Sequence, residues 1–367
     1  MEQLRLAPAI FRAANPPGPG DAKVTGAKES CPDASETAAW SEHNPAMPPG
    51  AMSSPEEADP ESVLASMTAR ISITTTETSF IIRRLLMLTP ALSAGLRRAL
   101  RSQIMTEVRG ARALVTGANG GLGRAIAIGL RAQGAELVVT GRRAGPVEAV
   151  AAEVGGRAIV ADLADRSQLE RILAEAGDLD ILVANAALPA SGDLGDWEQH
   201  QIDRVLEVNL ANPIAMTRAL LPRFRERGSG HFVYVSSLSG KVASKGASLY
   251  SATKFGLRGF AGGLRADVHG SGIGVSVIFP GFVRDAGMFA DSGATLPRGV
   301  GTVSPEAVTK AVLKAIRADK AEVDVAPISL RAGALIGALA PGLSATVQAR
   351  VGNGLSEQLI EAQRDKR

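Results

Sequence analysis

Short apolar runs alternate with longer amphipathic stretches from residue 105 to the end of the chain. The runs are rich in valine, isoleucine and leucine, which is typical of strands buried on both faces of a sheet. Seven strands are predicted, at 112–117, 136–141, 157–162, 180–185, 231–237, 274–281 and, at an edge, 321–326. Helical spacing recurs at 121–134, 166–175, 201–226, 248–268 and 304–320. This alternation predicts one α/β domain over residues 105–367, built on a doubly wound parallel sheet.

The first 104 residues lack this pattern. Ten of the twenty prolines precede residue 61 and acidic residues outnumber basic ones, so we expect residues 1–75 to be a disordered, proline-rich acidic extension. Residues 76–104 are apolar with clustered arginines, and their longest uncharged run, 85–96, is too short to span a bilayer. We interpret 76–104 as a basic apolar linker, while an amphipathic segment at a membrane surface stays open.

Composition narrows the function classes. The chain is 45% apolar and 21% charged with a net charge of +3, and this near balance gives no indication of a nucleic-acid partner. The single cysteine, Cys31, excludes an intrachain disulfide framework and suits a cytoplasmic location. The four histidines are scattered along the sequence, so we expect no metal site. Only two tyrosines are present, which makes a tyrosine within a motif informative.

A glycine-rich loop, TGANGGLG at residues 116–123, joins the first strand to the first helix. Glycines there let the backbone approach a pyrophosphate, and the amino end of the helix favours its charge. The same glycines could instead serve tight packing between strand and helix. Two spacings fit the loop: T-G-x-x-x-G-x-G through Gly117, Gly121 and Gly123, and G-x-x-G-x-x-G through Gly117, Gly120 and Gly123.

Four further residues suggest carbonyl chemistry. Tyr250 and Lys254 stand four residues apart and therefore share one face of a predicted helix. Ser237 precedes Tyr250 by thirteen residues at the end of a strand, and Asn209 lies in the amphipathic stretch 201–226. A cation one helical turn from a phenol should lower its pKa, which would ease proton exchange near neutral pH. Taken singly, each could equally be an ordinary packed or capping residue.

Together with Asn185-Ala186 after the fourth strand and Pro280-Gly281 after the sixth, these motifs resemble the classical short-chain dehydrogenase/reductase family over residues 108–325. The resemblance implies a Rossmann fold in which Tyr250 exchanges a proton with the substrate and Ser237 donates to the substrate oxygen. Lys254 would also bind the nicotinamide ribose, and Asn209 would hold a water that relays protons. The first glycine spacing is that of the classical branch and the second that of the extended branch.

The resemblance also implies a set of cofactor-binding residues. They are Gly117, Asn119, Gly121, Leu122, Gly123, Arg142, Asp162, Leu163, Asn185, Ala186, Tyr250, Lys254, Pro280, Gly281 and Val283. The second strand ends without the carboxylate that would accept hydrogen bonds from an adenosine ribose, and it supplies Arg142 and Arg143 instead. Because Arg142 can pair with a 2′-phosphate, we expect NADP in preference to NAD.

Three positions depart from the family pattern. The Asn-Asn-Ala-Gly motif reads Ala-Asn-Ala-Ala at 184–187, and Gly120 stands where a serine is common. Asp285 stands where a threonine commonly contacts the nicotinamide carboxamide, and an aspartate could accept from the same amide. None of the three removes a predicted catalytic residue.

The C-terminal part contains a predicted substrate lid, about 282–302, and a helical tail, about 328–367. Phe282, Met288 and Phe289 give the lid an apolar surface, which indicates an apolar substrate. Residues 332–349 are uncharged, but Pro341 and many small residues argue against a transmembrane span. We expect the tail to cover the substrate cleft or a neighbouring subunit, with peripheral membrane contact left open.

The sequence thus predicts an NADP-dependent oxidoreductase that interconverts a small-molecule carbonyl and a secondary alcohol, as a homodimer or homotetramer. One alternative is an extended-type member of the family, such as a sugar-nucleotide epimerase or dehydratase, although few residues follow Tyr250 for such a member's substrate domain. Another is a non-catalytic sensor of the dinucleotide. The complete set of Ser237, Tyr250 and Lys254 argues against a sensor, because binding alone does not require it.

Overall fold

The computed structural model describes residues 106–297, 299–342, 346 and 353–364. The predictions for residues 1–75 and 76–104 lie outside the described residues, and so does part of the predicted tail. Within the described ranges, no helix has both the length and the apolar character needed to cross a membrane.

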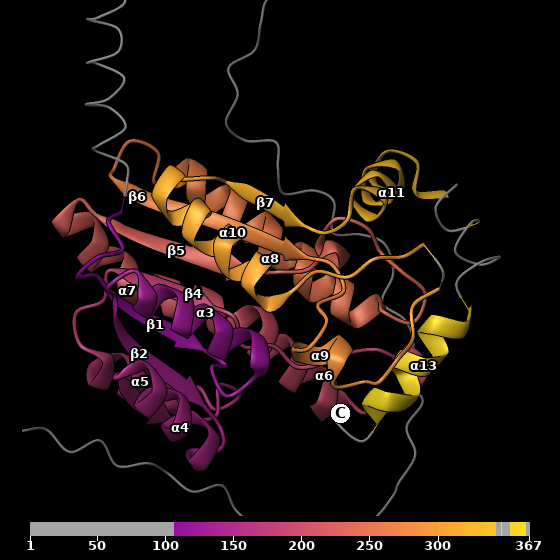
Figure 1. The fold of residues 1–367 in the computed structure, drawn as a ribbon, viewed down its shortest axis with the longest axis horizontal. Helices are drawn as coiled ribbons and strands as arrows, with labels where there is room; N and C mark the ends of the chain where they lie inside the picture. Colours follow the sequence, from indigo (N-terminus) through magenta and orange to yellow (C-terminus); the bar gives the residue numbers. More distant parts are fainter. Residues whose placement is uncertain (1–105, 298, 343–345, 347–352, 365–367) are drawn as a thin grey trace, which may run out of the picture. The chain divides into compact units, whose positions relative to one another are not determined.

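Seven parallel strands form one sheet in the order β3-β2-β1-β4-β5-β6-β7 (Figure 1). The strands are β1 Arg112–Thr116, β2 Glu136–Gly141, β3 Arg157–Val160, β4 Ile181–Ala184, β5 Gly230–Val235, β6 Ile273–Pro280 and β7 Glu322–Val325. The order runs outwards in both directions from β1 and β4, so the loops that follow these two strands diverge and leave a crevice at their carboxyl ends. The predicted doubly wound Rossmann sheet is confirmed, with β7 at the edge as expected.

Helices cover both faces of the sheet because side chains alternate along each buried strand. In β1, Ala113 and Val115 belong to one apolar cluster and Leu114 to the other. The first cluster includes residues of α3 Gly121–Ala132, α4 Ala144–Val154 and α10 Pro305–Ala318. The second includes residues of α5 Ser167–Ala176, α7 Asn212–Arg227 and α8 Ser248–Asp267. The Ser304 hydroxyl caps α10 by accepting from the Ala307 N–H at 3.2 Å.

Two helical regions differ from the prediction. Helix α4 was not predicted, although its buried residues 147, 150, 151 and 154 have helical spacing. The stretch 201–226 is not one regular helix: α6 Gln199–Leu206 passes through a π-helical turn, Glu207–Ala211, into α7. Such wide turns often occur at functional sites, and this one contains Asn209.

Among the described residues, the short helix α9 Gly287–Ala290 follows β6, and α11 Ile328–Leu339 and α13 Asn353–Gln363 follow β7. Figure 1 shows all three on the side of the sheet where the strands end. They therefore stand over the crevice left by the strand order.

His231 in β5 is fully buried between strands. It pairs in register with Gly274 of β6, where a Cβ would lie 2.2 Å from His231 Nδ1, so the imidazole occupies the space that any side chain at 274 would need. His231 Nε2 lies 2.8 Å from the Ser276 hydroxyl. Burial lowers the pKa of His231 to about 4; the charge of Asp319 acts in the opposite direction, and the charge of Arg265 lowers the pKa slightly further. The ring is therefore neutral in the folded protein at neutral pH.

This histidine should make stability depend on pH. In the unfolded chain its pKa is near 6.5, so between about pH 6.5 and 4 only the unfolded state gains its proton. The free energy of unfolding should fall as the pH drops through this window, by up to about 3 kcal/mol from this group. Urea unfolding at pH 7 and pH 4.5 measures the change. His231→Gln should reduce the difference, whereas substitution of the exposed His200 by Gln should not; equal differences in wild type and His231→Gln would contradict the assignment.

Candidate active site

A cavity of about 1250 Å³ opens at the carboxyl ends of the central strands. All fifteen residues predicted to bind the cofactor line it, as do Ser237 and the lid residues Phe282, Met288 and Phe289. Pockets for drug-sized ligands are about 300–1,000 Å³, so this cavity has room for a dinucleotide together with a second molecule. Among the predicted catalytic residues, Asn209 is the one that does not line the cavity.

The structure distinguishes the two glycine spacings. Gly117 has a φ of +65°, and a Cβ there would lie 2.8 Å from Ala186 Cα. A Cβ at Gly121 would lie 2.8 Å from Ala286 Cβ, whereas at Gly120 the nearest atom, Gly117 O, is 3.4 Å away. The packing therefore requires glycine at 117 and 121 but not at 120, which fits T-G-x-x-x-G-x-G. Because α3 begins at Gly121, the loop and the helix amino end line the cavity together, an arrangement that suits an anionic pyrophosphate.

Asn185 and Thr116 hold the ends of β1 and β4 together beneath this loop. The Thr116 hydroxyl accepts from the backbone N–H groups of Asn185 and Ala186, each at 3.0 Å. The Asn185 amide donates to the Thr116 carbonyl at 3.0 Å. The Asn185 side chain therefore fixes the backbone on which the loop stands, and the two changed neighbours in the Ala-Asn-Ala-Ala sequence leave that role intact.

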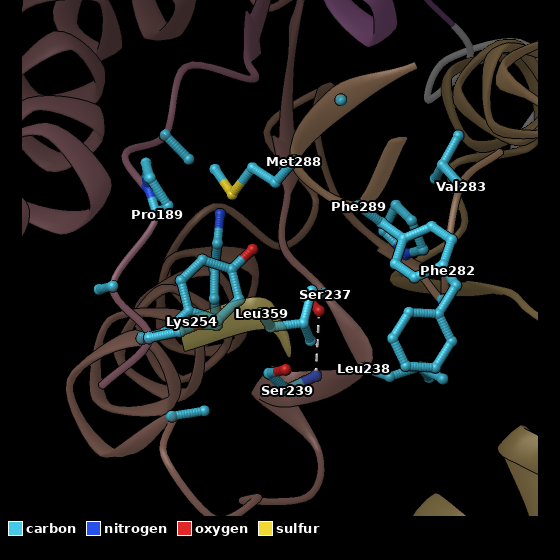
Figure 2. A pocket seen from close by; sticks show the side chains of 18 of the residues that line it. Pro189, Ser237, Leu238, Ser239, Lys254, Phe282, Val283, Met288, Phe289 and Leu359 are labelled. Carbon is cyan, nitrogen blue, oxygen red and sulfur yellow. Dashed lines mark hydrogen bonds between the residues drawn. The ribbon is translucent and has the colours of Figure 1, made fainter. Parts of the chain in front are cut away.

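Ser237, Tyr250 and Lys254 come together from β5 and α8. The Ser237 side chain lies near enough to the Tyr250 hydroxyl to lower its pKa. Ser237 also caps a short 3₁₀ turn, Leu238–Gly240, by accepting from the Ser239 N–H at 3.1 Å (Figure 2). The Lys254 ammonium donates to the Val235 carbonyl at 3.0 Å and lies 5.5 Å from the centroid of the Tyr250 ring.

Close packing fixes this group. A Cβ at Gly240 would lie 2.6 Å from Ser236 Oγ and 2.7 Å from the Lys254 carbonyl oxygen. Ser236 Oγ also donates to that carbonyl at 3.2 Å. The turn after β5 is therefore pressed against the backbone of α8, which holds Ser237 beside Tyr250.

Burial shifts both titratable groups toward their neutral forms. It raises the pKa of Tyr250 to about 12, although the Ser237 side chain acts in the opposite direction, and it lowers the pKa of Lys254 to about 8. The expectation of a depressed tyrosine pKa is therefore not met, because desolvation of the phenolate outweighs the effect of Ser237. Near pH 7 the pair consists of a neutral phenol, which can donate a proton, and a charged lysine.

Asn209 occupies a different position from the one expected. Its side chain is 1% exposed, accepts from the Leu188 N–H at 2.6 Å and donates to the Leu188 carbonyl at 3.0 Å. Both polar atoms are thus engaged by the loop after β4, and Leu188 in that loop lines the cavity. The Asn209 side chain thus holds the loop after β4 in place and does not itself line the cavity.

A basic residue, Arg142, directly follows β2, as the sequence indicated. Arg142 lines the cavity and forms no hydrogen bond or ion pair with any described residue, whereas Arg143 does not line it. Asp162, after β3, pairs with Arg204 at 2.8 Å. Although burial raises the pKa of Asp162, hydrogen bonds from Ala164 and Arg204 and the charges of Arg204 and Arg142 bring it below its ordinary value. Arg142 thus remains available to an anionic ligand.

Asp285 does not enter the cavity. It has a φ of +64°, pairs with Arg284 at 3.4 Å, and its side chain is 75% exposed. The cavity lining contains its neighbours Ala286 and Gly287 instead. This exposed position does not support a contact between the Asp285 carboxylate and a nicotinamide amide.

The cavity also has walls that the sequence analysis did not resolve to residues. Loop residues 188–191 and 244–247 contribute, together with α11 and α13. In α13, Leu355, Leu359 and Gln363 follow one another at four-residue intervals, a signal visible in the sequence but too short to interpret without the fold. In the segment predicted to form a lid, the rings of Phe282 and Phe289 pack at a centroid distance of 5.0 Å and form an apolar surface beside Ser237 (Figure 2).

Comparisons with known proteins agree with this geometry. The family described as short chain dehydrogenase matches residues 111–296. The chain is 36% identical over 231 residues to the ketoacyl reductase HetN of Nostoc sp. The aligned region covers 60% of this chain and 80% of that protein.

Two solved structures show the same likeness. One is a short-chain dehydrogenase from Sphingobium yanoikuyae in complex with NADPH, with a TM-score of 0.56 and 27% identity over 64% of this chain and 95% of that one. The other is a 3-ketoacyl-(acyl-carrier-protein) reductase from Brucella melitensis complexed with NADH, with a TM-score of 0.53 and 26% identity over 59% and 98%. These similarities support a nicotinamide dinucleotide without choosing between the two forms.

The loop geometry predicts unequal effects of two neighbouring substitutions. Gly121→Ala should lower the free energy of unfolding by about 1–3 kcal/mol, because its methyl group would collide with Ala286. Gly120→Ala should change it by less than about 0.5 kcal/mol, because the added methyl group would make only an ordinary contact. Urea denaturation of both variants measures the difference. A larger effect at Gly120 would favour the other glycine spacing.

Proposed function

The chain belongs to the short-chain dehydrogenase/reductase family, and from that membership we propose that it is an NADP-dependent enzyme interconverting an apolar carbonyl compound and its secondary alcohol. Membership makes it an NAD(P)-dependent oxidoreductase. The observation that carries the finer proposal is the joint lining of one cavity by the glycine loop and by Ser237, Tyr250 and Lys254. The relative named as a ketoacyl reductase supports carbonyl reduction as the reaction.

The cofactor preference rests on the end of β2. Carboxylates there favour an adenosine ribose without a phosphate, but this chain has Gly141 and Arg142. A guanidinium that forms no hydrogen bond or ion pair with a described residue suits a 2′-phosphate, because the charge-assisted pair can be bidentate. The glycine loop would hold the pyrophosphate, and Lys254 the nicotinamide ribose. When bound, NADPH supplies the hydride.

The proton chemistry follows from the three polar side chains. The Ser237 hydroxyl, whose oxygen already accepts from Ser239, directs its proton to the carbonyl oxygen of the substrate. Tyr250, neutral near pH 7, transfers its phenolic proton to that oxygen as negative charge develops on it. The Lys254 ammonium then stabilises the phenolate that remains. In alcohol oxidation the same groups act in reverse, with the phenolate as base.

The alternatives are less well supported. An extended-type epimerase or dehydratase would be expected to show the Gly120 spacing, and the packing at Gly121 favours the classical spacing instead. A non-catalytic sensor would not require Ser237 and Tyr250 in one cavity with a buried lysine. The lid residues Phe282, Met288 and Phe289 support an apolar substrate, because they expose carbon to the cavity.

Arg142→Asp should reverse or abolish the preference for NADPH over NADH. The substitution replaces a charge-assisted phosphate contact with repulsion, so NADPH affinity should fall about tenfold or more while NADH affinity changes little. Dissociation constants from the quenching of protein fluorescence measure both. Arg143→Asp is the matched control, since it places the same charge change one residue outside the cavity lining. If the ratio of the dissociation constants for NADPH and NADH is unchanged in Arg142→Asp, Arg142 does not determine the cofactor preference.

Tyr250→Phe should separate binding from turnover. The ring and its packing survive, so NADPH should bind nearly as before, while ketone reduction should slow by about 10²- to 10⁴-fold through loss of the general acid. Lys254→Met should impair both NADPH binding and turnover, because we propose that this lysine binds the nicotinamide ribose and stabilises the Tyr250 phenolate. NADPH absorbance with a panel of ketones and aldehydes follows turnover. Near-normal turnover in Tyr250→Phe would refute this mechanism.

A further inference from the structure

Helix α13 forms one wall of the cavity. Leu355, Leu359 and Gln363 are spaced at i, i+4 and i+8, so they form one stripe along the helix, and all three line the cavity. The stripe extends about 12 Å along the helix axis, because each residue adds about 1.5 Å. Its first two members are apolar and its last is an amide.

Contacts on two sides hold α13 in place. The side-chain oxygen Oε1 of Gln358 accepts from the Thr295 N–H at 3.0 Å and from the Thr295 hydroxyl at 3.3 Å, which joins the helix to the segment 282–302. On the other side, Ile360 lies against Gly246, where a Cβ would be 2.8 Å from Ile360 Cδ1. The helix is thus fitted between the lid and the loop that precedes α8.

The amide of Gln363 lacks an expected partner. Gln363 is only 7% exposed, and its side-chain oxygen Oε1 is buried without a hydrogen-bond partner among the described residues. Buried polar atoms in native proteins are nearly always satisfied, and an unsatisfied one is destabilising. Of the buried unpartnered side-chain atoms in the described ranges, this is the one whose residue lines the cavity. A hydrogen-bond donor on a bound molecule would satisfy it.

We propose that α13 selects the substrate: Leu355 and Leu359 contact its apolar body, and Gln363 Oε1 accepts a hydrogen bond from a hydroxyl or N–H group remote from the reacting carbonyl. This inference rests on the proposed function, because it places the reacting carbonyl at Ser237 and Tyr250. The substrate class is therefore an elongated apolar ketone with a second, donating polar group. An extended chain suits the stripe better than a compact ring, because it can contact both leucines and the amide.

Matched pairs of ketones test this selection. The probes are methyl ketones of six to twelve carbons, each with and without a terminal hydroxyl group. At the chain length that reaches Gln363, wild type should prefer the hydroxylated ketone by about three- to tenfold in kcat/KM, the value of one hydrogen bond. Gln363→Leu, which keeps the side-chain volume, should abolish that preference. Glu357→Gln, a substitution on the exposed side of the same helix, should retain it.

The apolar part of the stripe has its own test. Leu359→Ala should lower kcat/KM for ten-carbon ketones by about threefold or more relative to six-carbon ketones, because it removes carbon contacts that only the longer chain makes. NADPH affinity should be unchanged in both the Leu359 and the Gln363 variants. Weaker NADPH binding in Gln363→Leu, with the hydroxyl preference retained, would assign the amide to the cofactor and overturn the inference.

The outcomes separate the two proposals. No turnover of any ketone or aldehyde in wild type would refute the proposed function. Turnover of the simple ketones without a hydroxyl preference at any length, or with one that persists in Gln363→Leu, would leave the proposed function intact and refute the role of α13.

Discussion

The amino group of Lys254 is buried without a carboxylate beside it among the described residues, and the candidate active site depends on how that group is held. Its Nζ donates to the carbonyl of Val235, the last residue of β5, which joins the second turn of α8 to the end of a central strand. The turn after β5 packs closely against the α8 backbone at Gly240, and the Ser236 hydroxyl donates to the Lys254 carbonyl. Ser237 lies within that turn, so the same packing that buries the lysine brings the serine to Tyr250.

Burial of Tyr250 and Lys254 changes the pKa of both side chains. A desolvated lysine loses its proton more easily and a desolvated phenol less easily, so at neutral pH the pair is an ammonium beside an intact acid. Proton transfer from Tyr250 would create a phenolate next to that ammonium, and each charge would offset the desolvation of the other.

The sequence predicted the sheet and most of the cavity because both rest on local patterns. Continuous apolar runs can be satisfied only in strands covered on both faces, and the residues after those strands meet at one edge. What it missed depends on tertiary contacts. The π-helical turn at Asn209 and the outward turn of Asp285 need backbone geometry that residue type does not specify. Likewise, the raised pKa of Tyr250 reflects desolvation, and the unpartnered amide of Gln363 is recognisable only once α13 is packed beside the lid.

The central claim is that the charge on buried Lys254 supports proton donation by Tyr250. Its most direct test is kcat/KM for ketone reduction from pH 6 to 10, in wild type and in Lys254→Met. Because burial lowers the pKa of Lys254 to about 8, wild-type kcat/KM should be level below that pH and fall above it as the ammonium is lost. The residual activity of Lys254→Met should lack this fall. A wild-type profile that stays level through pH 9, or the same fall in Lys254→Met, would contradict the account.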